Sequence, residues 1–294
     1  MSRIARCVIG VLLAAVACGG MVNHAAAAAG AQEPESGALR RQLWLIPFPA
    51  ANVDMRTLVF RPRGAGPFPL AVINHGSTQD ADSRTGAPMQ EFQALTSWFV
   101  RHGYAVAIPE RPGHGRTGGP YLEDQGDCEQ ADYRRSGLAT AASIEVAIAY
   151  MTAQPFVRRR DVIVVGQSAG GWGALALASR NPPSVKAVIN FAGGRGGRSY
   201  GRSNNNCAPD RLIAALRDFG RTERIPTLWI YTENDSYFPP DLSRSMAEEF
   251  GLAGGSVEYH LLPAFGSEGH VLAESRDTAP IWGATLEAFL ARLR

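Results

Sequence analysis

The 294-residue sequence lacks the features that mark several classes of protein. After the N-terminal region, no segment approaches the roughly 18 consecutive apolar residues of a transmembrane helix, so we expect no membrane span. The chain has a single lysine, Lys186, and it lies in the apolar stretch 185–190, so Schiff-base chemistry is not expected. A basic stripe with interleaved aromatic residues is also missing, which argues against a nucleic-acid partner.

An excess of charge of one sign is missing as well. Arg3 and Arg6, the apolar run 8–17 and the small residues 25–29 predict a secretory signal peptide over residues 1–29, followed by a linker at 30–42. Removing the two arginines lowers the basic residues from 29 to 27, which equals the 27 acidic ones. Lipid anchoring at Cys18 is an alternative, but the leucine usual three residues earlier is missing.

Cysteine is scarce, with four residues in the chain. Cys7 and Cys18 belong to the predicted leader, so the mature protein keeps Cys128 and Cys207. An even number of cysteines in a secreted or periplasmic protein is typical of a disulfide, and we expect these two to pair. The alternative is two free thiols.

The pattern of apolar runs favours one α/β domain over residues 43–294. Predicted strands alternate with predicted helices, and this rhythm indicates a mostly parallel sheet of about eight strands with helices on both faces. The expected strands are two in 43–62, then 68–74, 105–108, 162–165, 185–191, 227–231 and 257–262. The expected helices are 89–101, 132–152, the segment after Ser168, 210–219, 241–252 and 279–293.

One serine lies where such a sheet places a nucleophile. Gly166-Gln167-Ser168-Ala169-Gly170 follows an apolar strand and precedes the helical segment 171–178, which is the strand–turn–helix context of a nucleophile elbow. With 32 glycines in the chain, the pentapeptide alone is weak evidence, and an incidental serine in a Gly-rich turn is the alternative. A second match around Ser199 has neither a strand before it nor a helix after it, so we interpret it as loop.

A serine hydroxyl needs a base and a group that orients the base. Asp235 follows the predicted strand 227–231 and His270 follows the last strand, so both are expected at the edge where Ser168 lies. Glu233 is the rival carboxylate and is expected to cap a turn instead. An ordinary turn aspartate and a surface loop histidine remain the simpler alternatives for Asp235 and His270. We interpret His114 as shaping its loop.

Further residues are expected around this serine. The backbone N–H groups of Ser77 and Ala169 are candidates for the oxyanion hole, and His75 is interpreted as bracing the turn that precedes Ser77. The stretch 193–208 is long and rich in Gly, Arg and Asn, which makes it a candidate lid. The expected pocket residues are Trp172, Tyr121, Tyr200 and Tyr237.

The chain resembles the α/β-hydrolase superfamily, within it the dienelactone-hydrolase-like and prolyl-oligopeptidase-like branch. The resemblance spans about residues 43–293 and rests on His75-Gly76-Ser77, the pentapeptide around Ser168, Asp235 and Gly269-His270. The order Ser, Asp, His is that of the superfamily. Dienelactone hydrolases themselves use a cysteine nucleophile, so lactone specificity is not implied for a chain with serine at this position.

The expected function is that of a secreted serine hydrolase, most simply a carboxylic ester hydrolase acting on a small-molecule substrate through an acyl-enzyme, with no metal or organic cofactor. Two alternatives stay open. One is a serine peptidase with the same triad, although related peptidases usually carry an additional N-terminal domain that the run before Leu43 is too short to encode. The other is a non-catalytic binding protein with this fold, which loss of a triad member would have favoured.

Overall fold

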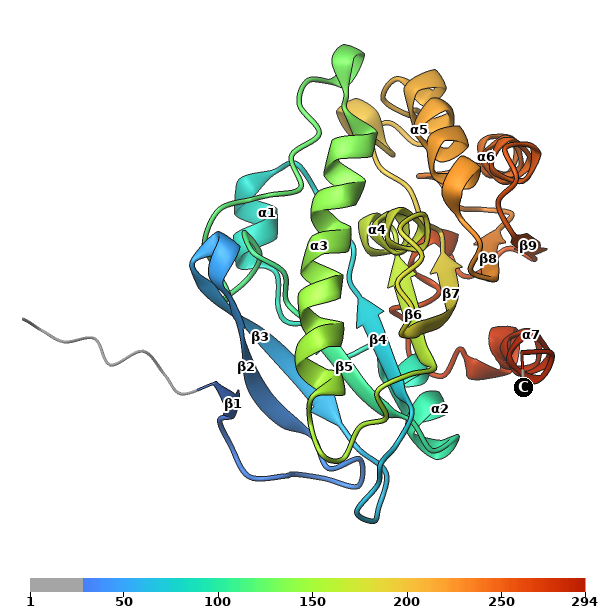
Figure 1. Cartoon of the computed structure of the whole chain (residues 1–294). Coiled ribbons are helices and arrows are strands. Elements are labelled where there is room, and N and C mark those ends of the chain that lie inside the picture. The colour runs from blue at the N-terminus through green and yellow to red at the C-terminus, as the bar shows by residue number, and fades with distance from the viewer. Residues whose placement is uncertain (1–28, 294) are drawn as a thin grey trace, which may run out of the picture.

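A twisted sheet forms the centre of the computed structural model, which describes residues 29–293 (Figure 1). The predicted signal peptide lies almost entirely outside these residues. The expectation of one α/β domain with a mostly parallel sheet is confirmed, with nine strands among the described residues where about eight were expected. The strands are β1 (Gly30–Ala31), β2 (Gln42–Phe48), β3 (Val53–Phe60), β4 (Leu70–Asn74), β5 (Ala105–Pro109), β6 (Val162–Gln167), β7 (Val185–Phe191), β8 (Thr227–Thr232) and β9 (Val257–Leu262).

The strand order across the sheet is β1-β2-β3-β5-β4-β6-β7-β8-β9. The pairs from β1 to β3, and the pair of β3 with β5, are antiparallel. The six strands from β5 to β9 run parallel to their neighbours. Their carboxyl ends therefore share one edge of the sheet, which is where ligands bind in folds of this kind.

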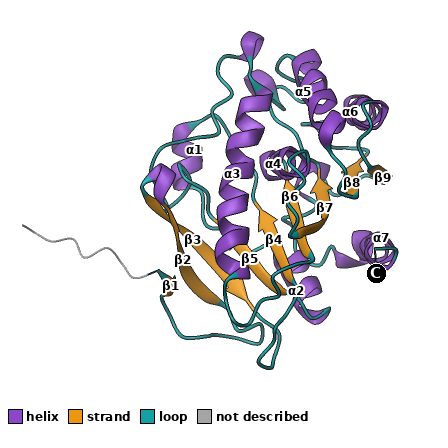
Figure 2. Ribbon diagram, in the orientation of Figure 1, coloured by secondary structure: helices purple, strands orange, loops and turns teal. Residues whose placement is uncertain are grey.

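The described part of the chain has seven α-helices, and six of them cover the two faces of the sheet (Figure 2). The seven helices are α1 (Ala81–Gly86), α2 (Gln93–Arg101), α3 (Tyr133–Thr152), α4 (Ala169–Ala178), α5 (Pro209–Thr222), α6 (Pro240–Leu252) and α7 (Ala279–Ala291). Helices α3, α4, α5 and α6 pack on one face, and α2 and α7 pack on the other.

The two faces explain the composition of the central strands. Successive side chains of a strand point to opposite faces. In β6, Val162 and Val164 join the core beneath α3 and α4, whereas Ile163 and Val165 join the core beneath α2 and α7. A strand buried on both sides has no polar face, which is why β6 appears in the sequence as a continuous apolar run.

Two elements differ from the sequence-based expectation. Strand β1 lies in the segment 30–42 that was expected to be a linker, and it pairs Gly30 with Leu45 and Ala31 with Trp44. Helix α1 was not expected; it is short, and Asp80 caps it by accepting a hydrogen bond from the Ser83 N–H at 2.8 Å. Six residues without an apolar stripe leave no periodic signal, so the pattern could not have indicated this helix.

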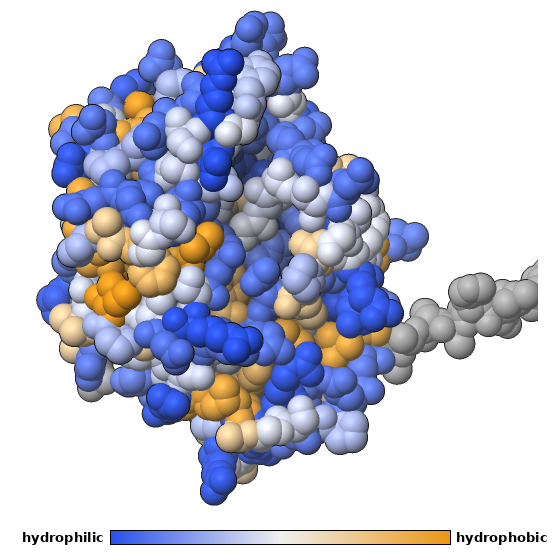
Figure 3. All heavy atoms as spheres, turned by 180° about the vertical axis from the view of Figure 1, so that it is seen from behind, coloured by the Kyte–Doolittle hydropathy of each residue, from blue (hydrophilic) through white to orange (hydrophobic). Residues whose placement is uncertain are grey.

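The surface opposite the view of Figure 1 is mostly hydrophilic, with apolar side chains in small groups (Figure 3). Four large apolar side chains are exposed among the described residues, namely Tyr200, Leu252, Val271 and Ile281. Tyr200 and Val271 line the same cavity, which lies at the carboxyl edge of the sheet.

Candidate active site

Ser168 lies on a tight turn between β6 and α4, with backbone angles φ 55° and ψ −122°. A positive φ is strained for a residue with a side chain, and the strain is typical of a nucleophile elbow. The neighbouring glycines make the turn possible. A side chain at Gly166 would collide with the backbone of Gly170, and one at Gly170 would collide with the backbone of Asn74.

Asp235 and His270 form a buried pair at the same edge. Nδ1 of His270 lies 3.2 and 3.1 Å from the two carboxylate oxygens of Asp235. The Asp235 Oδ1 atom also accepts hydrogen bonds from the N–H groups of Tyr237 and Phe238, at 2.8 and 3.0 Å. These donors fix the carboxylate, and the carboxylate in turn orients the imidazole. The ring of Tyr237 stacks on that of His270 with centroids 4.1 Å apart, which fixes the ring plane.

Glu268 joins the loops that carry Asp235 and His270, and no motif or periodic pattern in the sequence marks it. Its carboxylate accepts hydrogen bonds from the N–H and hydroxyl groups of Ser236, at 3.1 and 2.5 Å, and from the N–H of His270 at 3.1 Å. Burial alone would raise its pKa, but these hydrogen bonds outweigh burial and lower the pKa below its usual range. Arg198 of the candidate lid lies 3.6 Å from the same carboxylate.

Ser168 and His270 both line a cavity of about 1040 Å³. Among the described residues, no hydrogen bond joins the Ser168 hydroxyl to His270. Nucleophile and base are often apart in a structure without substrate and come together in the complex. The structure therefore joins Asp235 to His270 directly and brings Ser168 to the same cavity wall.

The turn that carries Ser77 lies against the nucleophile. A Cβ atom placed on Gly76 would lie 2.7 Å from Oε1 of Gln167 and 3.3 Å from Cβ of Ser168, so the glycine lets the turn lie close to the nucleophile. Neither Ser77 nor Ala169 uses its backbone N–H in a hydrogen bond within the described part of the chain. Ala169 is the first residue of α4, where N–H groups have no partner inside the helix. Both amides are therefore free to donate to a ligand oxygen.

The four aromatic residues expected in the pocket have different positions. Tyr237 and Tyr200 line the cavity, and Tyr200 is 80% exposed. Tyr121 lies behind the cavity wall, where its hydroxyl is 3.1 Å from Oγ of Ser77. The expectation for Trp172 is wrong. Its side chain is fully buried and donates a hydrogen bond from Nε1 to the carbonyl of Tyr133 in α3, because this side of α4 faces α3 and not the cavity.

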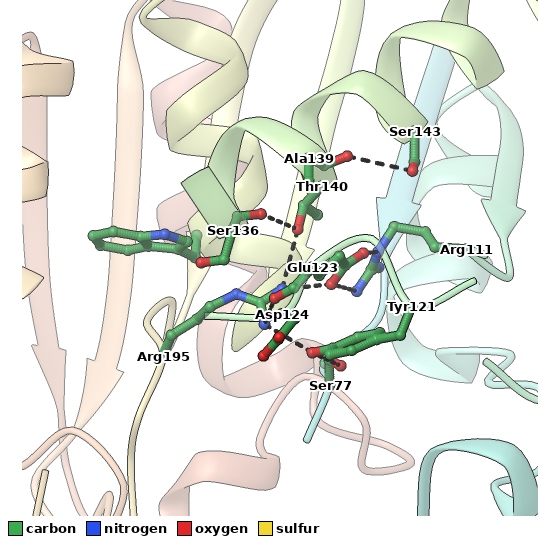
Figure 4. Close-up of polar contacts among 12 residues, drawn as sticks. Ser77, Arg111, Tyr121, Glu123, Asp124, Ser136, Ala139, Thr140, Ser143 and Arg195 are labelled. Atoms are coloured by element: carbon green, nitrogen blue, oxygen red, sulfur yellow. Dashed lines mark hydrogen bonds and ion pairs between the residues drawn. The ribbon is translucent and has the colours of Figure 1, made fainter. Parts of the chain in front are cut away.

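A buried ion cluster supports the loops on the Ser77 side (Figure 4). Glu123, 1% exposed, forms ion pairs with Arg111 and Arg195, which are also buried. Burial would raise the pKa of Glu123, but the two guanidinium groups outweigh burial and hold the pKa far below its usual range. No short sequence pattern links residues 111, 123 and 195, so the cluster could not be identified before the fold was known.

The candidate lid is attached to the loop that precedes α3. Cys128 and Cys207 form the expected disulfide, with Cα atoms 5.1 Å apart, and both residues line the cavity. Ser199 of the second G-x-S-x-G match lies in a short 3₁₀ turn, Ser199–Gly201, as expected for a loop.

Within residues 29–293, no group of three or more His, Cys, Asp or Glu side chains is arranged to hold a metal ion. No helix in this part of the chain has the length and apolar character needed to cross a bilayer.

The strand order, the elbow serine and the histidine after the last strand define the class of protein, an α/β-hydrolase. The model of the dienelactone hydrolase family matches residues 55–289, so the chain belongs to that family and is a hydrolase by this membership. Among curated proteins, none matches the chain significantly.

Solved structures share the fold at low sequence identity. A putative dienelactone hydrolase from Klebsiella pneumoniae subsp. pneumoniae MGH 78578 has a TM-score of 0.58 and 16% identity over 85% of this chain and 98% of its own. An acetyl xylan esterase from Paenibacillus sp. R4 has a TM-score of 0.58 and 16% identity over 85% of this chain and 83% of its own. A puromycin-hydrolyzing peptidase from Mycobacterium tuberculosis has a TM-score of 0.58 and 19% identity over 86% of this chain but 39% of its own.

Proposed function

We propose that the protein is a secreted serine hydrolase that cleaves carboxylic esters through an acyl-enzyme. The observation that supports this most directly is the buried Asp235–His270 pair, which opens onto the cavity that Ser168 also lines. A carboxylate that accepts from Nδ1 leaves Nε2 as the proton acceptor, and that tautomer can deprotonate a serine.

In the first half of the reaction, the Ser168 oxygen attacks the ester carbonyl while His270 takes the hydroxyl proton. The carbonyl oxygen becomes negative and accepts hydrogen bonds from the free N–H groups of Ser77 and Ala169. The C–O bond to the alcohol then breaks, and His270 returns the proton to the departing alkoxide. Asp235 holds the ring and stabilises its protonated form.

In the second half, His270 deprotonates a water molecule that attacks the acyl carbonyl. The collapse of the second tetrahedral intermediate breaks the bond to Ser168, which regains the proton, and releases the carboxylic acid. We favour an ester over an amide because an alkoxide leaves more readily than an amine. The esterase among the structural neighbours agrees with this choice.

The secreted location rests on the predicted signal peptide and on the Cys128–Cys207 disulfide, since disulfides persist in oxidising compartments. Export of a reporter fused to residues 1–29 would test it. A reporter that stays in the cytoplasm would contradict the proposal.

The chemistry is tested by labelling the mature chain with a fluorophosphonate probe and by its hydrolysis of p-nitrophenyl acetate. Ser168→Ala should abolish labelling and lower kcat by at least about 10⁴-fold. Ser199→Ala is the matched control, because it changes the serine of the second G-x-S-x-G match, and it should retain both activities. Labelling that persists in the Ser168 variant would refute the assignment. Turnover of p-nitroanilides but of no ester would favour a peptidase.

A further inference from the structure

A chain of hydrogen bonds connects the buried ion cluster to the turn at Ser77 (Figure 4). Nη1 of Arg195 donates to the Tyr121 hydroxyl oxygen at 3.1 Å. The Tyr121 hydroxyl lies 3.1 Å from Oγ of Ser77, and that Oγ lies 2.8 Å from Nε2 of His114. Four side chains from three loops thus form one continuous line.

The partners at the His114 end fix the direction of every hydrogen bond in this line. Nδ1 of His114 lies 3.2 and 3.1 Å from the carbonyl oxygens of Arg111 and Pro112, which only accept, so Nδ1 carries the ring proton. Burial lowers the pKa of His114 to about 4, which leaves the ring neutral at pH 7. Nε2 therefore accepts from the Ser77 hydroxyl, and the Ser77 oxygen is left to accept from Tyr121.

The same ion cluster also holds the other side of the turn. Arg111, paired with Glu123, donates from Nη1 to the carbonyl of His75 at 2.9 Å and from its backbone N–H to Nε2 of His75 at 3.2 Å. Because His75 and Ser77 flank Gly76, both ends of the turn are anchored to one buried group. Gly76 packs directly on Ser168, so a shift of this turn moves the Ser77 amide relative to the nucleophile.

We propose that Tyr121 and Arg195 are positioning residues that hold the Ser77 amide where the oxyanion forms. This inference rests on the proposed function. Arg195 lies in the candidate lid segment 193–208, and Tyr121 and Glu123 lie in the loop before α3, so the two loops joined by the Cys128–Cys207 disulfide also set the geometry of the oxyanion hole. Hydrogen-bond donors stabilise a transition state only when they are held in place beforehand.

Tyr121→Phe tests the proposal, because it removes one oxygen and keeps the ring. We expect kcat for p-nitrophenyl acetate to fall about 10-fold, equivalent to about 1.4 kcal/mol, with KM changed less than 2-fold. The Ki of an alkylboronic acid, which forms a tetrahedral adduct on serine, should rise by the same factor as kcat falls. Tyr259→Phe is the matched control, since its hydroxyl makes a similar contact with Ser243 at 2.9 Å away from the cavity, and it should leave kcat unchanged.

A double-mutant cycle separates positioning from a general loss of structure. Ser77→Ala removes the next oxygen of the line and should give a loss similar to that of Tyr121→Phe, with little further loss when the two are combined. Additive losses, a wild-type kcat in Tyr121→Phe, or a KM that rises while kcat is kept would overturn the proposal. If the wild-type protein is not labelled at Ser168 and hydrolyses no ester, the proposed function fails instead.

Discussion

Replacing Asp235 by Asn should remove most of the activity while leaving the fold intact. Asn has nearly the same size and shape as Asp, and Asp235 is 1% exposed, so a substitution that changes volume would confuse packing with chemistry. Asn changes the charge and turns one acceptor atom into a donor.

The contacts decide which atom becomes the donor. Oδ1 of Asp235 accepts from two backbone N–H groups, those of Tyr237 and Phe238, so the amide oxygen must stay at that position. The NH₂ group then occupies the Oδ2 position, 3.1 Å from Nδ1 of His270, and the amide oxygen, 3.2 Å from Nδ1, already accepts two hydrogen bonds. Two donors cannot face each other, and the ring proton moves to Nε2. In that tautomer His270 cannot accept the proton of Ser168, so we expect kcat/KM to fall about 10³–10⁴-fold, or roughly 4–5.5 kcal/mol.

The assay is steady-state hydrolysis of p-nitrophenyl acetate at pH 7.5, with thermal melting as the check on folding. Glu233→Gln is the matched control because it neutralises the exposed carboxylate two residues away, which is the rival candidate for the orienting acid. Its kcat/KM should stay within 2-fold of the wild-type value.

A folded Asp235→Asn variant with kcat/KM within 10-fold of wild type would refute the tautomer argument. A larger loss in Glu233→Gln than in Asp235→Asn would show that the other carboxylate orients the base.

Three further changes have expected outcomes. Glu268→Gln keeps the shape but removes the negative charge that strengthens the bonds to Ser236 and His270 and attracts Arg198; kcat should fall about 10-fold, and an unchanged kcat would show that the charged link between the two loops is dispensable. Replacing Cys128 and Cys207 by Ser opens a loop of 79 residues and should lower the free energy of unfolding by about 2–4 kcal/mol in urea titrations, whereas equal midpoints would contradict this. Burial raises the pKa of Glu223 to about 7. The folded state therefore binds this proton more tightly than the unfolded state, and the resulting stability is complete below about pH 4.5 and is lost as the pH rises through 7. Glu223→Gln should remove this pH-dependent decrease in the free energy of unfolding, which is on the order of 2 kcal/mol after allowance for solvent screening. If the free energies of unfolding of variant and wild type change in parallel between pH 5 and 7, the prediction is contradicted.

The fold and the positions of the candidate catalytic residues could be predicted because each has a local signal. Ser168 lies between an apolar strand and a small-residue helix, and both are visible in a window of about 15 residues. Asp235 and His270 follow predicted strands, and parallel strands bring such residues to one edge of the sheet. The pairing of Asp235 with His270 was expected from their roles, but the contacts that hold the two loops in place could not be predicted, since these loops have no periodic pattern.

Trp172 shows where local reasoning fails. It lies four residues after Ser168, so sequence proximity placed it in the pocket. Ser168 precedes α4 and has a non-helical backbone, so helical spacing does not extend back to it, and the side of α4 that carries Trp172 faces α3. Glu268 and Glu123 were missed for a different reason: they support the site but were not predicted. Each binds partners that are distant in sequence or carry no motif, so only the folded structure shows these contacts.

The placement of these polar groups explains how loops can hold a catalytic geometry at all. Helix α4 and strand β6 fix Ser168 through apolar packing, which is insensitive to small changes of a polar side chain. The turn at Ser77 adds no side chain to these apolar cores. The loops of Asp235 and His270 add only a few, such as Phe238 and Leu272, and carboxylates that accept several hydrogen bonds also fix these loops. A buried ion cluster adds little net stability, because desolvation offsets its attraction, but its bonds are directional. Loss of one partner should therefore disturb the geometry of the site more than the apolar core of the fold.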